Sequence, residues 1–459
     1  MNWGGPILTS LDVVVREAAL FAAAGFLILG AGDLLVDFLW LVLRAKRGRR
    51  PLPTVDSLPS PQHAGTLAVF IPAWDESAVI GDMLRHALAA WGSGDYRLYV
   101  GCYPNDPATA DAVRAIGEPR LRLVIGPVPG PTTKADCLNR LWQALLADEA
   151  ASGSPVKAII LHDAEDFVSP DELRLFDTAV ERWDLVQLPV HPLIHPGARW
   201  VSGHYADEFA QAHGKELPVR QWLGAGLPSA GVGCAFSRDI LGRVAAANHG
   251  SPFQAESLVE DYELGLQVAE TGGRAVFLRV SGTDGLPVAT REYFPRTFST
   301  AVHQKARWMT GIALAGWDRL GWRGSLAERW MRLRDRQSLL AACFLFSAYL
   351  SLALWLIFTP LRAAAGLDLP AVPPLLAALL EVNLWVLAWQ MAVRAGFTWR
   401  CYGWREGLRA VPRAMIGNLI AIVAAAGALG RYRSLRRTGH AEWGKTDHFF
   451  PTPAQASAR

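Results

Sequence analysis

Long apolar segments lie near both ends of the chain and restrict what it can fold into. Residues 18–43 form the first, and roughly 338–360 and 372–393 form two more. A membrane-spanning helix needs about 20 apolar residues, so each segment is long enough to cross a bilayer. The 459-residue chain is 51% hydrophobic, with the excess at its ends. The pattern therefore predicts a membrane protein built around a polar middle.

Basic residues set the predicted orientation, because positive flanks stay on the cytoplasmic side of a span. The first apolar segment is followed by Arg44, Lys46, Arg47, Arg49 and Arg50. We predict an N-terminal transmembrane anchor over 1–50, a Pro-rich linker over 51–65 and two transmembrane helices within 336–395. The middle then faces the cytoplasm, which agrees with five scattered cysteines and no CxxC pair.

Two details of the apolar segments leave alternatives. Asp33 and Asp37 lie one helical turn apart in the first segment. They either face protein or water, or lie near the cytoplasmic end and touch the interface, which we favour. Residues 414–430 could span, but both flanks are basic, and a span would place one of them outside. We therefore predict that 396–459 forms an interfacial helix, beginning at Pro412, and a cytoplasmic tail.

Between the apolar ends, strand and helix patterns alternate. The predicted strands are 67–72, 98–102, 121–125, 158–161 and 185–189, and the predicted helices are 77–90, 107–116, 133–147 and 170–182. Alternating units give an α/β domain with a mostly parallel sheet and helices on both faces. We place this domain at 66–290 and interfacial helices at 291–335.

Several classes of protein are disfavoured by what the middle lacks. No GxGxxG opens a helix after a strand and no GxxxxGK[ST] occurs. This argues against a dinucleotide-binding oxidoreductase and a P-loop NTPase. The net charge of +3 gives no case for nucleic-acid binding.

Three carboxylates follow the apolar strand at 158–161: Asp163, Glu165 and Asp166. Strand ends of an open α/β sheet are where such folds bind ligands. The three acids repel one another unless a positive group lies between them, and hard oxygen ligands suit Mg²⁺ or Mn²⁺. The pattern predicts a divalent cation carrying a diphosphate. The alternative is a surface turn that caps a helix starting near Ser169.

Other polar residues recur at strand ends and helix starts. They are Glu76, Asp106, Lys134, Asn139, Glu260, Asp261, Gln304, Arg307 and Trp308. A carboxylate can accept a hydroxyl proton, arginine suits a diphosphate and tryptophan suits the face of a sugar ring. Each residue alone is also compatible with a cap or a turn. The clusters that contain Glu76, Asp106, Lys134 with Asn139, and Asp163 recur along one edge of one sheet, and this recurrence favours a shared site.

Together these residues carry a family resemblance. The order Asp106, Asp163-x-Glu165, Glu260-Asp261 and Gln304-x-x-Arg307-Trp308 resembles the D, DxD, [TV]ED and QxxRW series of membrane-embedded family-2 glycosyltransferases. Cellulose, hyaluronan and poly-N-acetylglucosamine synthases belong to that family. One departure is Glu165 at the second position of DxD, which leaves open whether Glu165 or the adjacent Asp166 is the ligand.

Finer features resemble the NfrB-type inner-membrane glycosyltransferases, known as phage-adsorption proteins. These features are the runs 162–166, 203–208 and 228–233 and the pattern Trp443-x-Lys445-Thr446-x-His448-x-x-Pro451. The longer NfrB-type proteins carry a C-terminal cyclic-di-GMP-binding domain. We do not expect that domain here, since the chain stops at Arg459.

The resemblance implies a GT-A fold and assigns roles on the donor side of the site. Asp106 would contact the nucleotide with Glu76 nearby, and Lys134 and Asn139 would lie near the diphosphate. The metal and the nucleotide-sugar would be held by Asp163 and Glu165.

On the acceptor side, the resemblance implies that Asp261, with Glu260 beside it, deprotonates the acceptor hydroxyl. Gln304, Arg307 and Trp308 would complete the nucleotide-sugar site. Within this group Arg307 would stabilise the departing diphosphate and Trp308 would line the acceptor end. One base and no covalent nucleophile predict a single displacement that inverts the sugar carbon.

We therefore expect an inverting glycosyltransferase of the bacterial inner membrane that uses Mg²⁺ or Mn²⁺ and a UDP-sugar. It would extend and translocate an exopolysaccharide from a cytoplasmic catalytic domain, with an outer-membrane export partner. The NfrB likeness points to UDP-N-acetylmannosamine as the donor. One alternative is a lipid-phosphate glycosyltransferase that adds a single sugar. Another is a non-catalytic membrane scaffold for an outer-membrane partner.

Overall fold

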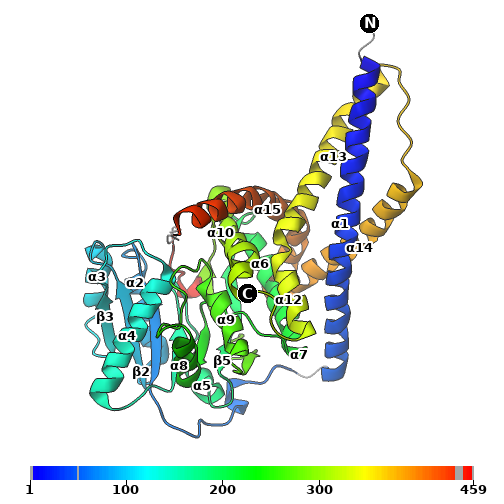
Figure 1. The fold of residues 1–459 in the computed structure, drawn as a ribbon. Helices are drawn as coiled ribbons and strands as arrows, with labels where there is room; N and C mark the ends of the chain where they lie inside the picture. The colour runs from blue at the N-terminus through cyan, green and yellow to red at the C-terminus, as the bar shows by residue number, and fades with distance from the viewer. Residues whose placement is uncertain (1–3, 49–50, 440–447, 457–459) are drawn as a thin grey trace.

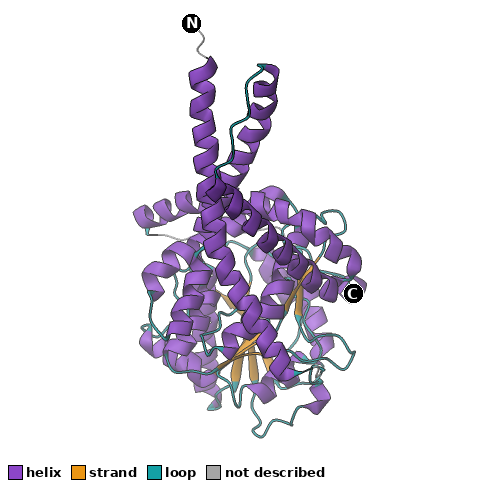
Figure 2. Cartoon of the chain, turned by 90° about the vertical axis from the view of Figure 1, so that its right-hand side faces the viewer, coloured by secondary structure: helices purple, strands orange, loops and turns teal. Residues whose placement is uncertain are grey.

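The structure is a computed structural model that describes residues 4–48, 51–439 and 448–456. Figures 1 and 2 show a rounded body of strands and helices from which long helices project on one side. The body contains the middle of the sequence, and the projecting helices come from its two ends.

A seven-stranded sheet forms the centre of the body. Its order is β3-β2-β1-β4-β7-β5-β8, and among these strands β7 runs antiparallel to both neighbours while the other pairs are parallel. A second, two-stranded parallel sheet joins β6 and β9. The strands are β1 Leu67–Pro72, β2 Tyr96–Cys102, β3 Leu121–Ile125, β4 Ala158–Leu161, β5 Leu185–Gln187, β6 Val190–Leu193, β7 Cys234–Ser237, β8 Ala275–Phe277 and β9 Thr290–Tyr293.

Helices cover both faces of this sheet, as predicted. Successive side chains of a strand point to opposite faces, and β1 follows this rule: Val69 joins a core with α2 and α5, while Phe70 joins a core with α4 and α8. The helices of this part are α2 Ile80–Trp91, α3 Pro107–Arg114, α4 Lys134–Ser152, α5 Glu172–Ala179, α6 Ser202–Gln211, α7 Leu217–Trp222, α8 Arg238–Ala247 and α9 Glu260–Glu270, with the short 3-10 helix η1 Val55–Ser57 and the π-helix η2 Ala212–Glu216.

The predicted elements are present with small shifts of their ends. β1, β3 and β4 have the predicted bounds, whereas β2 begins earlier and β5 ends earlier. Helix α4 continues beyond the predicted end because Gly153, with φ 68°, is the first residue that closes it in a left-handed conformation. The predicted α/β architecture is therefore confirmed.

A further group of helices lies between the sheet and the projecting part. It comprises α10 Phe298–Met309, the π-helix η3 Thr310–Ala315, α11 Gly316–Leu320 and α12 Leu326–Arg336, and the tail adds α16 Pro453–Ala456. Thr297 caps α10 by accepting a hydrogen bond from the backbone N–H of Thr300. This group occupies the region predicted to hold interfacial helices.

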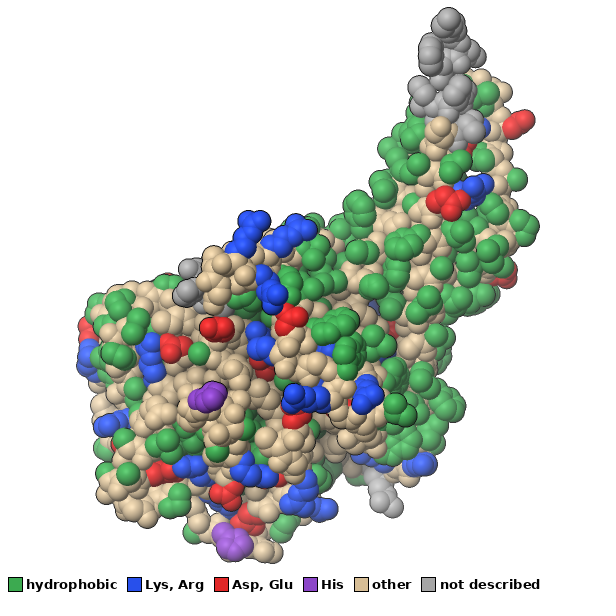
Figure 3. All heavy atoms as spheres, in the orientation of Figure 1, with side chains coloured by type: hydrophobic (Ala, Val, Ile, Leu, Met, Phe, Trp, Pro, Cys, Tyr) green, Lys and Arg blue, Asp and Glu red, His purple; other side chains and the backbone are tan. Residues whose placement is uncertain are grey.

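The projecting part consists of α1 Gly4–Arg47, α13 Ser338–Ala364 and α14 Pro374–Tyr402. All three are long and apolar enough to cross a membrane, as is α15 Trp404–Thr438, by length and composition. Figure 3 shows hydrophobic side chains over most of the projecting surface, whereas charged side chains gather on the body. An apolar shaft beside a polar body is the arrangement expected of a membrane-anchored protein.

Polar contacts divide α1 into a shaft and a base. Asp12 pairs with Arg362 of α13, and Asp33 accepts hydrogen bonds from Arg334 (2.9 Å) and Gln390 (3.2 Å). The roughly 21 residues between the two acids cover about 32 Å at about 1.5 Å per residue. That length matches the hydrocarbon core of a bilayer, about 30 Å.

Asp37 lies one turn further along α1 and is buried with Lys215 of η2, their charged groups 2.5 Å apart. Trp389 of α14 donates a second hydrogen bond to Asp37 at 2.8 Å. Asp33 and Asp37 therefore both contact protein, which is the first of the two alternatives that the sequence allowed. Asp37 links the anchor, the body and α14.

We expect Asp37→Ala to lower the free energy of unfolding by about 3–5 kcal/mol, because it leaves the Lys215 ammonium buried without its carboxylate. Thermal unfolding of the purified protein in detergent, followed by tryptophan fluorescence, measures the effect. The double variant Asp37→Leu with Lys215→Met should regain most of the loss, since a buried pair can be replaced by apolar residues. Equal melting of Asp37→Ala and wild type would refute the importance of this pair.

Helix α15 differs from the prediction at its start. It begins at Trp404, and Pro412 lies inside it rather than at its first turn. In Figure 1 α15 crosses over α10 at a large angle to α1 and α13, and the hydroxyl of Thr310 donates to the backbone carbonyl of Ala428 at 3.3 Å. This course agrees with an interfacial helix, although the length and composition of α15 would also allow a span.

Candidate active site

The loop after β1 is held by the end of β2. Asp106 caps α3, and its carboxylate accepts hydrogen bonds from the backbone N–H groups of Asp75 (2.6 Å) and Thr109 (3.3 Å). The hydroxyl of Thr109 accepts from the N–H of Glu76 at 2.9 Å. Asp75 has a φ of 55°, a conformation that a non-glycine residue keeps only when neighbours hold it. Asp106 thus fixes the backbone that presents Glu76; its contact with a nucleotide stays a prediction.

A buried histidine organises the turn after β4. His162 lies between two acids, with Nδ1 2.8 Å from Asp166 and Nε2 2.9 Å from Glu172. Asp166 also accepts a hydrogen bond from the N–H of Asp163 at 3.0 Å. Burial alone would lower the pKa of His162, but Glu172 and Asp166 raise it to about 10. Asp166 therefore stabilises the turn through these hydrogen bonds, whereas Asp163 and Glu165 face the site.

Glu165 meets two residues that are distant in the sequence. Nδ1 of His448, in the C-terminal tail, lies 2.8 Å from Glu76 and 3.2 Å from Glu165. The three side chains offer ligand atoms within 4.8 Å of one another, a grouping that can hold a metal ion. Burial raises the pKa of Glu165 to about 8, with repulsion from Asp163 and Glu76 acting against the attraction of His448. A divalent cation would relieve this repulsion.

His448 was not among the predicted site residues. Its only signal in the sequence was its place in the tail pattern that resembles NfrB-type proteins. Aromatic contacts hold this part of the tail: Phe450 lies 5.9 Å from Phe167 and 5.9 Å from His86 between ring centres. The tail residues 440–447, which include Trp443, Lys445 and Thr446 of that pattern, lie outside the described residues.

Lys134 connects the strand-end acids with the acids of α9. Its ammonium is 2.5 Å from Asp163, and the residue opens α4 directly after the cap Thr133. Burial would lower the pKa of Lys134, but Asp163, Glu260 and Asp261 together raise it above its ordinary value. A cation that interacts with Asp163 and with the pair Glu260 and Asp261 requires these three acids to share one site.

Glu260 and Asp261 occupy the first turn of α9. Burial raises the pKa of Glu260 to about 7, and repulsion from Asp261 adds to it against Lys134 and Arg307. Burial also raises the pKa of Asp261, while Lys134 and the N–H of Tyr262 oppose the shift. A raised carboxylate pKa suits a general base.

The backbone packs closely against the Asp261 carboxylate. A Cβ at Gly231, where φ is 76°, would lie 2.7 Å from Oδ2 of Asp261. Glycine is required here on both counts, by conformation and by space. The run 228–233 thus shapes the wall next to the proposed base.

The QxxRW residues lie on α10, beside the start of α9. Arg307 donates to the backbone carbonyl of Leu258 at 2.9 Å. Trp308 packs edge-on against Tyr205 and Phe294, and Oε1 of Gln304 is buried without a hydrogen-bond partner among the described residues. Arg307 is close enough to Glu260 to lower the pKa of that carboxyl, so α10 borders the site.

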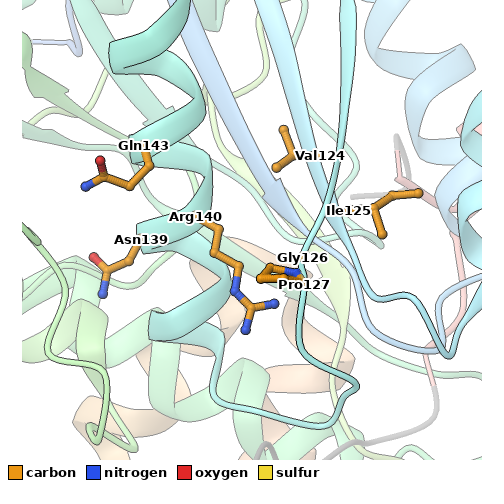
Figure 4. Close-up of a pocket in the computed structure, with 7 residues that line it drawn as sticks. All are labelled: Val124, Ile125, Gly126, Pro127, Asn139, Arg140 and Gln143. Atoms are coloured by element: carbon orange, nitrogen blue, oxygen red, sulfur yellow. The ribbon is translucent and has the colours of Figure 1, made fainter.

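Asn139 does not join this cluster. Its side-chain amide donates to the carbonyl of Phe253 at 2.7 Å and accepts from the N–H of the same residue at 3.1 Å. Figure 4 shows Asn139 pointing away from β3, while Arg140 extends toward Gly126 beside a surface hollow of about 230 Å³. Asn139 holds the loop before α9, and its contact with a diphosphate stays a prediction.

Asp207, in the run 203–208 that resembles NfrB-type proteins, makes structural contacts. It is fully buried on α6 and binds Arg413 of α15 at 2.8 Å and Thr398 of α14 at 3.1 Å. Neighbouring Glu208 pairs with Lys305 of α10. These contacts join the body to the helices above it.

Comparison with known proteins identifies the chain. The family model of glycosyltransferase-like family 2 matches residues 63–311, more than half of the sequence. The chain belongs to this family. The predicted glycosyltransferase assignment is therefore confirmed, and the matched region contains every strand of the central sheet and the QxxRW residues.

Two curated relatives extend the similarity beyond the family domain. The chain is 35% identical over 480 residues to bacteriophage adsorption protein B of Escherichia coli K12 and to bacteriophage N4 adsorption protein B of Escherichia coli O157:H7. In each case the alignment covers 98% of this chain and 64% of the relative. The predicted likeness to phage-adsorption proteins is thus confirmed, and the chain spans somewhat less than two thirds of their length.

A solved structure agrees with the predicted GT-A fold. The mannosyltransferase PcManGT of Pyrobaculum calidifontis, in complex with GDP-Man and Mn²⁺, has a TM-score of 0.53 and 18% sequence identity. The match covers 90% of this chain and 99% of the mannosyltransferase. At this identity the comparison supports the fold of this family-2 glycosyltransferase.

Proposed function

We propose that this family-2 glycosyltransferase transfers a sugar from a nucleoside diphosphate donor to a glycan acceptor at the inner face of the bacterial inner membrane. The observation that carries the proposal is the position of Lys134. Its ammonium lies 2.5 Å from Asp163, and Glu260 and Asp261 are close enough to help raise its pKa. Lys134 thus links Asp163, on the donor side, to Asp261, the proposed general base. A donor-binding acid and a general base in one site are expected when a single reaction uses both.

The residues of the site divide the chemistry between them. Glu165, Glu76 and His448 would hold Mg²⁺ or Mn²⁺, with Asp163 beside them, and the cation would neutralise charge on the diphosphate. Arg307 would stabilise the leaving diphosphate on the other side. Asp261 would take the proton of the acceptor hydroxyl, which then attacks the sugar carbon as the bond to the diphosphate breaks. With one base and no covalent nucleophile, the sugar carbon is inverted.

The helices around the site favour a membrane product. The base of α1 contacts Arg334 of α12 through Asp33 and Lys215 of η2 through Asp37, so a glycan formed here would emerge beside the lipid. We propose an exopolysaccharide that is extended and translocated, with an outer-membrane partner for export. The resemblance to NfrB-type proteins makes UDP-N-acetylmannosamine the first donor to test.

A panel of UDP-sugars tests the function. The purified protein is incubated with each donor, and release of UDP and the size of the product are followed. We expect one donor to give UDP together with a polymer. A product that gains one sugar on a lipid phosphate would favour the single-addition alternative. No UDP from any donor, with a cellular phenotype that survives Ala at Asp163, Asp261 and Arg307, would favour the scaffold.

We expect chelation with EDTA to abolish UDP release and Mn²⁺ or Mg²⁺ to restore it. Glu76, Glu165 and His448 supply oxygen and nitrogen ligands that suit these ions. The measurement is the initial rate before and after dialysis against a titration of each metal. Full turnover by the chelated enzyme would rule out the metal.

A further inference from the structure

The C-terminal end of α15 is strongly basic and lies against the helix that carries the QxxRW residues. Its last two turns contain Arg431, Arg433, Arg436 and Arg437, and Figure 3 shows Lys and Arg side chains gathered where Figure 1 places the end of this helix. Three of these arginines are exposed, whereas Arg431 is partly buried. A guanidinium that loses part of its hydration on burial needs a partner to compensate for it.

Two contacts fix the direction in which Arg431 leaves α15. The backbone carbonyl of Ala428 accepts a hydrogen bond from the π-helix η3 at 3.3 Å, and a Cβ at Gly427 would lie 3.4 Å from Cβ of Ala306 in α10. Arg431 follows these two α15 residues by three and four positions, so all three share one face of the helix. That face packs on the last turn of α10, which contains Arg307.

Arg307 and Arg431 are close to each other, and their positive charges repel. Neither guanidinium forms an ion pair with a residue that the structure describes, and Arg307 donates to the backbone carbonyl of Leu258 instead. Two like charges that are held together in this way are stabilised when an anion binds both of them. The geometry therefore favours an anionic ligand at this place.

The carboxylate of the neighbouring helix α11 does not fill this role. Asp318 accepts a hydrogen bond from the hydroxyl of Tyr432 at 2.6 Å and lies 3.6 Å from Arg436. Both partners are on α15 but leave it in other directions than Arg431, because one and five residues correspond to about 100° and 140° around a helix. Arg431 is thus available to a bound anion.

The two arginines lie on the side of the site where the sugar bond breaks. Arg307 acts to lower the pKa of both Glu260 and Asp261, so it lies near the proposed base. A general base works beside the reacting sugar carbon, and the oxygen that leaves this carbon belongs to the phosphate attached to the sugar. That phosphate gains negative charge as the bond breaks, and guanidinium groups bind phosphate oxygens through paired hydrogen bonds.

We propose that Arg431 binds the sugar-bearing phosphate of the donor together with Arg307. The inference rests on the proposed glycosyltransferase function and adds to it a residue outside the matched family domain, which ends at residue 311. It also makes α15 part of the donor site. This helix contacts α13 through Asn418, which donates to the hydroxyl of Tyr349 at 3.3 Å, so donor binding and the membrane helices are connected through α15.

A comparison of UDP with UMP tests the assignment in the full-length protein, because UMP lacks the phosphate that carries the sugar. Titration calorimetry with Mn²⁺ measures the binding of each nucleotide, in detergent without lipid and in nanodiscs of phosphatidylcholine with or without phosphatidylglycerol. The variants are Arg431→Gln, which removes the charge, and Arg431→Lys, which retains it. The matched control is Arg433→Gln, which removes an exposed charge two residues further along the same helix.

We expect Arg431→Gln to weaken the binding of UDP about 10–100-fold, the usual loss for a hydrogen bond between charged groups. Binding of UMP should change less than about threefold, which also shows that the variant is folded. Arg431→Lys should lose less affinity for UDP than Arg431→Gln, because an ammonium keeps the charge but not the paired hydrogen bonds. Arg433→Gln should bind both nucleotides like wild type.

Unchanged binding of UDP by Arg431→Gln would overturn the inference. Equal losses for UDP and UMP would also overturn it, because the variant would then affect the nucleotide site as a whole. So would a loss that occurs only in nanodiscs with phosphatidylglycerol, which would show that Arg431 binds the headgroup phosphate of a lipid. A wild type that neither binds UDP nor releases it from any donor would count against the proposed function instead.

Discussion

Asp261→Asn should reduce sugar transfer by about 10²–10⁴-fold while leaving UDP binding unchanged. The amide has the shape of the carboxylate but cannot accept the acceptor's proton, and general-base catalysis is worth about that factor. The initial rate of UDP release with acceptor measures the loss, and titration calorimetry with UDP and Mn²⁺ measures binding. Transfer within tenfold of wild type would place the base elsewhere.

The neighbouring acid provides the matched comparison. Glu260→Gln changes the same kind of group one residue away and leaves Asp261 as the proton acceptor, so its loss should be smaller. The pH profile separates the two further. Because burial raises the pKa of Asp261, the wild-type rate should increase with pH as this carboxylate loses its proton. That acid limb should disappear in Asp261→Asn and remain in Glu260→Gln.

The donor side of the site was predictable because its determinants are local. Asp106 and Asp163 each follow a short apolar strand, and parallel strands bring their carboxyl ends to one edge of a sheet. The strand runs are visible in the sequence as continuous apolar stretches, since both faces of the sheet are covered. Sequence pattern alone could therefore place these acids together before any contact was known.

His448 could not be placed in this way. It lies 372 residues from Glu76, and apolar helices separate it from the catalytic domain in the sequence. A histidine in a tail has no periodic pattern that would direct it to a strand end. The tail pattern shared with NfrB-type proteins marked it as unusual, and only the folded chain brings it to Glu76 and Glu165.

Asn139 shows the opposite difficulty. Its nearness to Lys134 in the sequence suggested a shared ligand, but five residues along a helix correspond to about 140° around its axis. The two side chains therefore leave α4 in different directions, and both polar atoms of the Asn139 amide bind Phe253. The start of α15 also differs from the prediction. Pro412 is typical of a first helical turn, but the helix begins earlier, at Trp404.

Glu165→Gln should lower the rate of transfer at least about 100-fold at ordinary Mn²⁺ concentrations, because a loss of about 3 kcal/mol of metal-assisted stabilisation gives that factor. Glutamine keeps the shape of the side chain and a hydrogen bond toward His448, but it removes the charge that a metal requires. The pKa of Glu165, raised to about 8 by burial and by repulsion from nearby acids, is the mark of a carboxylate placed where a cation belongs.

Mn²⁺ binding provides a readout that does not depend on turnover. Electron paramagnetic resonance of free Mn²⁺ should show weaker binding to Glu165→Gln and to His448→Ala. The control Glu256→Gln, which neutralises an exposed acid, should bind like wild type. If Glu165→Gln binds Mn²⁺ as tightly as wild type, the cation is held by other residues, and Asp163 becomes the ligand to test. Since Asp163 is committed to Lys134 at 2.5 Å, that result would also require this ion pair to open when the donor binds.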